Sequence, residues 1–284
     1  MIPAPPPGQN DKVISVREVS FTYEGGLRAL SGVSLDVKSG DYLAVVGGNG
    51  CGKTTLAKVI VGLLRPDSGS ILISGRRTED LTVAEIARTV GYAFQNPDHQ
   101  LFCPTVLEEV RFGPRNMGYD GQEVEAKVAH ALEAMDIVAL RDSAPFSLTL
   151  SERRRVSIAA VIATDPKVLI LDEPTTGLDA RETQDLMDSI GRLNREGKTI
   201  VLITHDMKLV AGHAKRVVVM SEGRIVLDAD ASGVFSDLDS LLRSRLIPPP
   251  VAQLAYRLAP LGVPRDVLSP QELVLRLMMA RGGR

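Results

Sequence analysis

The feature that most constrains this chain is a glycine-rich run at residues 47–55, which reads GGNGCGKTT. An apolar stretch, residues 42–46, precedes the run, and a helix-competent stretch, residues 56–64, follows it. Strand, glycine loop and helix in this order indicate a phosphate-binding loop (P-loop). Glycines let backbone N–H groups close around phosphate oxygens, and the start of the helix adds partial positive charge.

Each residue of this loop has an expected task. Lys53 is expected to reach the β- and γ-phosphates of a nucleotide, and the Thr54 hydroxyl is expected to ligate Mg²⁺. Cys51 stands where such loops usually carry serine, either as a small neutral replacement or as a thiol activated at a helix N-terminus. The other residues expected to bind the nucleotide here are Gly47, Asn49, Gly50, Gly52 and Thr55.

Composition narrows the function. The 284 residues carry a net charge of −2, only 4% aromatic residues and no tryptophan, which argues against a nucleic-acid surface. No apolar run reaches the ~18–20 residues needed to span a bilayer. Residues 1–11 are proline-rich, lack the segments of a signal peptide and are expected to be a disordered tail. Two cysteines make no disulfide framework, which suits a reducing cytosol.

Apolar stretches and helical periods alternate along the chain, which predicts an α/β fold with a mainly parallel sheet. We expect a nucleotide-binding domain over residues 12–235, with a mostly helical insertion at about 92–165. Residues 236–284 are expected to form a small helical domain. The expected strands are residues 13–23, 33–37, 42–46, 69–75, 168–171, 199–203, 216–220 and 225–229, and the expected helices are residues 81–88, 123–136, 153–163, 181–195 and 207–212.

A second phosphate motif follows the apolar strand at residues 168–171. Asp172 ends this strand, and an acid at the carboxyl end of a parallel strand near a P-loop is placed to hold Mg²⁺. Glu173 would face the γ-phosphate and orient or deprotonate the attacking water.

Residues 172–179, DEPTTGLD, closely resemble the Walker B and D-loop segments of ABC-type ATPases. In their order and spacing along residues 13–235, three further landmarks are similar to that family. His205 resembles its switch histidine, Gln95 its Q-loop glutamine, and Tyr23 the aromatic residue that stacks on adenine. The resemblance implies an ABC-type P-loop fold with a mainly parallel core, an antiparallel β subdomain and a helical insertion. It also implies that Gln95 joins Thr54 and Asp172 at the metal, and that Lys53, Gln95, Glu173 and His205 are catalytic.

Two segments narrow the resemblance to the ATPase subunits of energy-coupling factor (ECF) transporters. These are residues 94–102, FQNPDHQLF, and residues 112–118, FGPRNMG. The resemblance implies a second ABC ATPase subunit, a transmembrane scaffold subunit and a substrate-capture membrane subunit as partners. It implies no nucleic acid, and a peripheral position on the cytoplasmic face of the membrane. The cargo would be a vitamin or a transition-metal ion, with ATP and Mg²⁺ as cofactors.

The C-terminal segment resembles the small helical domain with which ECF ATPases pair. Ser269-Pro270-Gln271-Glu272 reads as a helix start. The apolar stripe that follows it can either pack on its own domain or form a dimer surface; it comprises Leu273, Val274, Leu277 and Met278.

The ABC signature segment departs from the family. Where ABC ATPases carry a sequence close to LSGGQ, this chain reads Leu148-Thr149-Leu150-Ser151-Glu152. Leu150 and Ser151 replace glycines where the partner's nucleotide must approach closely, and Glu152 places an acid near a polyanion. We therefore expect an asymmetric pair, in which this chain's own P-loop is competent and its signature serves the partner's site poorly. Two alternatives stay open: a regulatory or structural subunit with little hydrolysis, and a soluble ABC ATPase outside transport.

Overall fold

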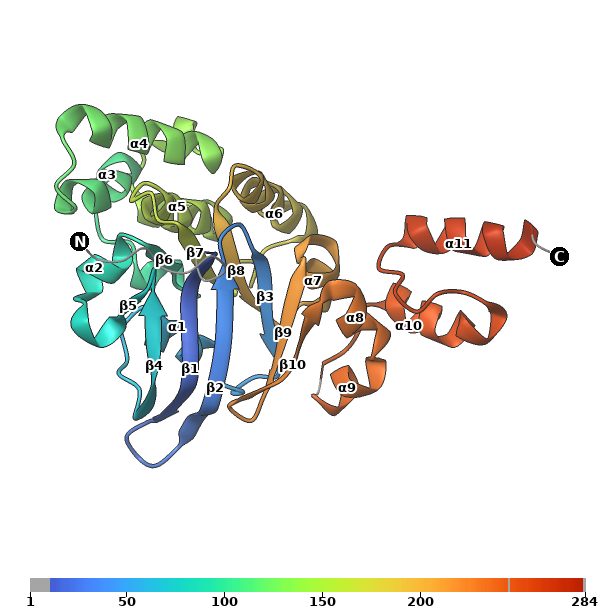
Figure 1. The fold of residues 1–284 in the computed structure, drawn as a ribbon. Coiled ribbons are helices and arrows are strands. Elements are labelled where there is room, and N and C mark those ends of the chain that lie inside the picture. The colour runs from blue at the N-terminus through green and yellow to red at the C-terminus, as the bar shows by residue number, and fades with distance from the viewer. Residues whose placement is uncertain (1–10, 245, 283–284) are drawn as a thin grey trace.

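The computed structural model describes residues 11–244 and 246–282, so the predicted disordered tail at residues 1–11 lies almost wholly outside it. Two β-sheets form its centre, and helices cover them (Figure 1). The predicted α/β fold, with a mainly parallel core, an antiparallel subdomain and a helical insertion, is confirmed. The strands at residues 13–23, 69–75 and 168–171 were predicted to within two residues.

A six-stranded sheet carries the P-loop, in the order β10-β9-β3-β8-β7-β6. Its strands are parallel except for β10, which pairs antiparallel with β9. Strands β3, β7 and β8 are buried along their whole length, as expected of parallel strands covered on both faces. Their bounds are β3 (Tyr42–Gly47), β6 (Val90–Ala93), β7 (Val168–Asp172), β8 (Thr199–Thr204), β9 (Arg216–Ser221) and β10 (Arg224–Asp230).

An antiparallel sheet of order β2-β1-β4-β5 packs on one face of the parallel sheet. Side chains alternate between the two faces of a strand, so Val168 and Ile170 of β7 join this antiparallel sheet and helix α1 (Lys53–Ile60). Leu169 and Leu171 face the opposite way, toward the helices of the second layer. The bounds of the antiparallel strands are β1 (Lys12–Thr22), β2 (Arg28–Lys38), β4 (Ser68–Ile73) and β5 (Arg76–Arg77).

The helical insertion contains α3 (Val106–Asn116), α4 (Gly121–Ala134) and α5 (Leu150–Ile162), and α6 (Ala180–Arg195) packs beside it. Helix α3 was not predicted, because Pro114 and Gly113 interrupt its apolar period. Thr105 caps its start and accepts a hydrogen bond from the Glu108 N–H. Short helix α2 (Val83–Ala87) and four 3₁₀ turns connect these layers; the turns are Thr78–Asp80, Pro97–His99, Val138–Leu140 and Pro145–Ser147.

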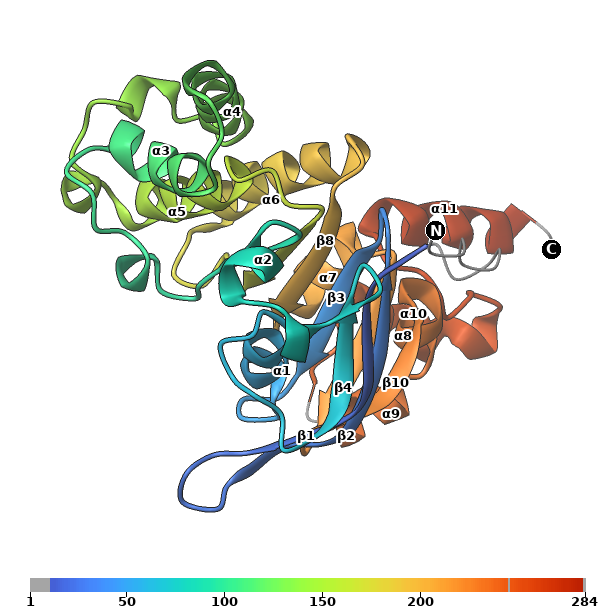
Figure 2. The same cartoon turned by 60° about the vertical axis from the view of Figure 1, so that its left-hand side comes forward.

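The C-terminal helices lie on the side of the molecule away from α3–α5, and Figure 2 shows the same separation from a second direction. Ala255, Val263, Val267 and Leu273 form a small buried cluster of their own there. In the described part of the chain, no helix combines the length and the apolar character needed to cross a bilayer. The bounds in this region are α7 (Met207–His213), α8 (Ala231–Ser236), α9 (Leu238–Arg243), α10 (Pro250–Leu258), the 3₁₀ turn Ala259–Leu261 and α11 (Pro270–Gly282).

Candidate nucleotide-binding site

Three neighbouring strands bring the residues that are predicted to bind phosphate and Mg²⁺ to one edge of the parallel sheet. β8 lies between β3 and β7, and its last residue, Thr204, is in register with Val46 of β3. Asp172, at the end of β7, is in register with Ile203 of β8. Because parallel strands end at the same edge, the P-loop, the acid pair and His205 converge there.

The P-loop conformation depends on its glycines. Gly50 and Gly52 have φ of 76° and 105°, a left-handed backbone conformation that residues other than glycine rarely adopt. A Cβ atom on Gly52 would lie 2.4 Å from the Ala29 carbonyl oxygen, and one on Gly47 would lie 2.3 Å from the Met220 carbonyl oxygen. The loop therefore packs against β2 and β9 without room for a side chain at either position.

Lys53 is buried at the start of α1. Its Nζ donates hydrogen bonds to the carbonyl oxygens of Gly47 at 2.9 Å and Gly48 at 3.2 Å. The Cys51 sulfur, also buried, lies 3.9 Å from the same nitrogen. The ammonium is thus held inside the loop, where it would exchange carbonyl oxygens for phosphate oxygens.

Tyr23 lies against the loop, as its resemblance to the adenine-stacking aromatic implies. Its hydroxyl is 3.0 Å from the buried Thr55 hydroxyl, and its ring packs edge-to-face on Phe21 at 4.9 Å. Asn49 is exposed on the outer side of the loop. Adenine stacking by Tyr23 stays a prediction.

The surroundings of the Asp172 carboxylate show whether it could bind Mg²⁺. Burial raises the pKa of Asp172 and the Glu173 charge adds to the rise, whereas the nearby Thr54 and Tyr92 hydroxyls and the Lys53 charge oppose it. Its Oδ2 accepts a hydrogen bond from the Tyr92 hydroxyl at 2.9 Å, whereas its buried Oδ1 has no hydrogen-bond partner among the residues that the structure describes. Among the described residues, no group of three or more His, Cys, Asp or Glu side chains could hold a metal by itself. One carboxylate oxygen without a partner beside a hydroxyl is the donor set expected for Mg²⁺, which protein sites bind through one or two carboxylates and substrate phosphates.

Glu173 adopts a strained backbone conformation directly after the strand. Its φ is 48°, its N–H donates to the Ile203 carbonyl oxygen at 2.8 Å, and its side chain is buried. Such conformations cluster at functional sites. The His205 Nδ1 lies 2.7 Å from Glu173 Oε1, and the His205 side chain is 58% exposed. The carboxylate is therefore fixed at the sheet edge by a ring that reaches in from solvent.

Gln95 is exposed just beyond β6, and its backbone is anchored by Arg154. Arg154 is only 3% exposed, and its guanidinium donates to the carbonyl oxygens of Gln95 and Thr176. From the sequence, the three arginines at 153–155 could either offset the Glu152 charge or form a solvated helix face; Arg154 is buried, so it does not belong to a solvated face. Arg154 and Tyr92, which contact the Gln95 backbone and Asp172, were not predicted from the sequence as part of this site.

The signature segment lies at the start of α5. Thr149 is the N-cap: its Oγ1 accepts the Glu152 N–H at 3.3 Å, and Glu152 Oε2 accepts the Thr149 N–H at 2.8 Å and its hydroxyl at 2.9 Å. This reciprocal pair is a capping box. Leu150 points toward the D-loop, with its Cδ2 2.9 Å from where a Cβ on Gly177 would lie, while Ser151 is buried and Leu148 packs on the helical core.

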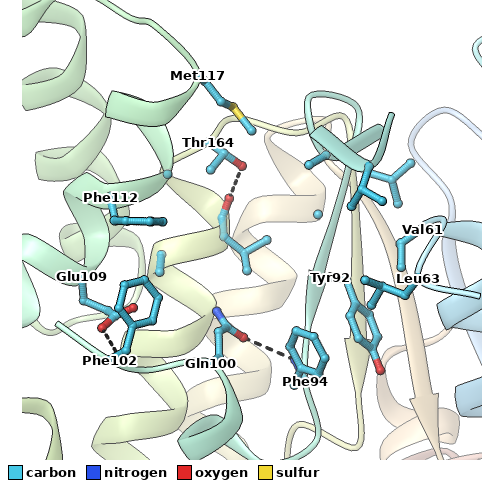
Figure 3. A pocket seen from close by; sticks show the side chains of 17 residues that line it. Val61, Leu63, Tyr92, Phe94, Gln100, Phe102, Glu109, Phe112, Met117 and Thr164 are labelled. Carbon is cyan, nitrogen blue, oxygen red and sulfur yellow. Dashed lines mark hydrogen bonds between the residues drawn. The ribbon is translucent and has the colours of Figure 1, made fainter. Parts of the chain in front are cut away.

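An apolar groove opens between β6 and the helical insertion (Figure 3). It encloses about 290 Å³, and Figure 3 shows Tyr92 and Phe94 on one side and Phe102 and Phe112 on the other. Phe102 and Phe112 stack edge-to-face at 4.8 Å and are both exposed. Glu109, buried beneath them, accepts the backbone N–H groups of residues 102 and 103 at 2.8 and 2.7 Å, so the groove floor has its charge satisfied.

The sequence profile of the ABC transporter family matches residues 30–176. A putative ABC transporter ATP-binding protein of Caldanaerobacter subterraneus is 43% identical over 93% of this chain and 46% of its own length. The energy-coupling factor transporter ATP-binding protein EcfA of Methanothermobacter thermautotrophicus is 37% identical over 95% of this chain and 88% of its own.

Among solved structures, CbiO1 of Clostridium perfringens, described as part of the ABC transporter complex CbiONQ, superposes with a TM-score of 0.74 at 36% identity. The match covers 82% of this chain and 94% of that structure. The chain spans less than half the length of the first three curated relatives it matches.

Proposed function

This chain belongs to the ABC transporter family of ATP-binding proteins, with relatives among the ECF ATPases, and from this premise we propose that it hydrolyses ATP to power an ECF-type importer. The cargo class we propose is a vitamin or a transition-metal ion. One observation carries the proposal: the Lys53 loop, the Asp172 oxygen that lacks a partner and the Glu173–His205 contact share one sheet edge.

In the proposed mechanism, the P-loop amides and Lys53 bind the phosphates and hold the γ-phosphate in place. Thr54, Asp172 and Gln95 would hold Mg²⁺, which when bound neutralises charge on the β- and γ-phosphates. Glu173 takes the proton of the attacking water, and its fixed carboxylate orients that water. His205 holds the Glu173 carboxylate and would also contact the γ-phosphate.

We further propose that the chain works in an asymmetric pair with a second ABC ATPase subunit. The capping box of α5 supports this: Glu152 already occupies the helix N-terminus with a carboxylate, where the partner's γ-phosphate would bind. The chain's own P-loop would use the signature of the partner. Paired with itself, the chain would have two poor composite sites.

The same capping box favours a second candidate function, a nucleotide-binding regulatory subunit with little hydrolysis. Single-turnover measurement on the assembled complex separates the two. A site built from this P-loop and the partner's signature hydrolyses bound ATP if the chain is the active ATPase, and does not if it only regulates.

The apolar groove supports a membrane partner. We propose that a helix of the transmembrane scaffold subunit inserts apolar side chains between Tyr92 and Phe112, next to the Gln95 segment. The substrate-capture membrane subunit would join through that scaffold. This arrangement would place the chain peripherally on the cytoplasmic face of the membrane.

The C-terminal helices support pairing of the two ATPase subunits. Leu273 is buried within its own domain and Leu277 packs beside it, so half of the predicted apolar stripe is internal. Val274, Leu275 and Met278 remain 52%, 57% and 67% exposed on α11. We propose that these three side chains face the partner ATPase.

The decisive experiment measures ATPase rates of the purified chain with and without the second ATPase subunit that co-purifies from native membranes. We expect Mg²⁺-dependent ATP binding by the lone chain, slow hydrolysis alone and faster hydrolysis in the pair. Fast hydrolysis by the lone chain would contradict the asymmetric pair. Absence of Mg²⁺-dependent ATP binding would overturn the proposed function itself.

A further inference from the structure

Tyr92 belongs to two features at once. Its ring lines the apolar groove and packs edge-on to Phe94, with centroids 4.7 Å apart and planes at 63°. Its hydroxyl leaves the groove and donates to Asp172 Oδ2 at 2.9 Å, across 80 residues of sequence. One rigid side chain thus connects the groove wall to the acid of the proposed metal site.

Strand register explains how the contact arises. Tyr92 of β6 pairs with Ile170 of β7, and Asp172 lies two residues further along the same strand. Residues two apart on a strand face the same side of the sheet. Tyr92 is therefore diagonal to Asp172 on one face, and its long side chain spans the remaining gap.

The contact decides which carboxylate oxygen remains for a metal. Oδ2 is occupied by the Tyr92 hydroxyl, whereas Oδ1 is buried and, within residues 11–244 and 246–282, has no hydrogen-bond partner. A carboxylate held through one oxygen cannot rotate freely about its Cβ–Cγ bond, so Oδ1 keeps one direction. Partners of this kind orient metal ligands, and their loss typically lowers metal affinity by about 10–100-fold.

We propose that Tyr92 is a positioning residue that orients Asp172 for Mg²⁺, and that Phe94 in the groove wall braces it. This inference rests on the proposed function, because it assumes that Asp172 ligates the metal of MgATP. It adds that the metal acid is held by the surface on which a membrane partner would dock. A displacement of the Tyr92 hydroxyl by about 1 Å would stretch the bond beyond hydrogen-bond range.

The first test removes only the hydroxyl. In the full chain, Tyr92→Phe is compared with the wild type by calorimetry, with Mg²⁺ titrated at saturating ATP and ATP titrated in EDTA. We expect apparent Mg²⁺ affinity to fall about 10–100-fold and ATP binding in EDTA to stay unchanged. Tyr42→Phe is the matched control, because the Tyr42 hydroxyl is buried without a hydrogen-bond partner at the start of β3.

Equal Mg²⁺ affinity in Tyr92→Phe and wild type would overturn the inference while leaving the proposed function intact. A wild type that shows no Mg²⁺-dependent ATP binding would instead overturn the proposed function. The brace is tested by Phe94→Leu in both backgrounds, as a double-mutant cycle. We expect it to weaken Mg²⁺ binding only where the Tyr92 hydroxyl is present. Equal effects in both backgrounds, or none in either, would remove Phe94 from the proposal.

Discussion

The starts of helices α1 and α5 both present backbone N–H groups, but only the start of α5 is capped by side chains of the chain itself. At α1, the N-cap is Gly52, no side chain caps the helix and its first turn holds no acid. At α5, Thr149 caps the helix and Glu152 places a carboxylate on it. A helix N-terminus attracts anions through its free N–H groups and its dipole. Such an end is therefore better placed to receive a phosphate where the chain supplies no anion of its own, as at α1, than where it supplies one, as at α5.

The largest expected effect comes from disabling the nucleotide site that begins at α1. Glu173→Gln removes the proposed base but keeps the size and the contact with His205. We expect turnover of the assembled pair to fall by about 10²–10⁴-fold, since positioned bases typically contribute that much. Nucleotide binding, measured by calorimetry, should persist.

The control for this change is Glu125→Gln, which alters an exposed carboxylate paired with Arg111 on the helical layer. It should leave turnover as it is. If Glu173→Gln kept the wild-type rate, Glu173 would not be the base, and the proposal that this chain's own nucleotide site hydrolyses ATP would be contradicted.

The second effect concerns the residue that ties the two regions together. Arg154 sits on α5 and donates to the backbone of the Gln95 segment and of the D-loop at Thr176. Arg154→Met leaves these carbonyl oxygens without their charged donor, and we expect a loss of about 2–3 kcal/mol in free energy of unfolding. Urea denaturation measures this loss.

Arg155→Met is the matched control, one position along the same helix. Arg155 donates to one carbonyl oxygen, that of Met135 at 2.9 Å, and its Nη1 lies 3.8 Å from the exposed Asp136 carboxylate. We expect it to lose about 1 kcal/mol. Equal losses from the two variants would mean that Arg154 is an ordinary helix contact with no special link between the regions.

The third expected effect comes from improving the signature segment at the start of α5. Glu152→Gln keeps the capping box, because glutamine serves at this position as glutamate does, but removes the charge. We expect the self-paired chain to hydrolyse ATP several-fold faster, because a charge at a helix N-terminus is worth about 0.3–1 kcal/mol, and faster still when Leu150→Gly and Ser151→Gly are added. Steady-state ATPase assays measure both changes.

The chain supplies a control for the charge itself. Helix α4 begins with the same reciprocal box, formed by Asp120 and Glu123. Glu123→Gln should leave ATPase activity unchanged. If the α5 variants also left it unchanged, the carboxylate at α5 would not be what limits the self-paired chain.

How far the sequence predicts this molecule depends on the distance over which each feature acts. The P-loop and the acid pair were readable because their residues are contiguous and follow apolar strands. The α5 capping box was not predicted, because the helix was expected to begin at residue 153, although Thr149 and Glu152 have the T-x-x-E spacing and bond to each other in the structure. Tyr92 and Asp172 meet across 80 residues, and no local pattern records that contact. Arg154 faces inward on a helix that is buried nearly all round, so no polar stripe marks it as special.

The smallest expected effect separates stability from activity. Asp36 lies on β2, in the antiparallel sheet, where burial opposes its ionisation. Hydrogen bonds from Ser15, Lys12 and Arg17 outweigh burial and lower the pKa of Asp36 to about 2. Because this folded-state pKa is below the ordinary value of 3.8, the carboxylate stabilises the fold above about pH 4, and that contribution is lost as the pH falls toward 2.

Asp36→Asn should therefore lower the free energy of unfolding by about 1 kcal/mol at pH 6, since Asp36 is a partly exposed ion-paired group. The difference from wild type should shrink between pH 4 and pH 2, followed by urea denaturation at each pH. ATP binding and turnover at pH 7 should not change, because Asp36 touches neither the P-loop nor α5. A difference that stays constant down to pH 2 would contradict the lowered pKa. A change in turnover would mean that a modest loss of stability alone alters activity. The roles of the α1 and α5 helix starts would then have to be tested by nucleotide binding rather than by ATPase rates.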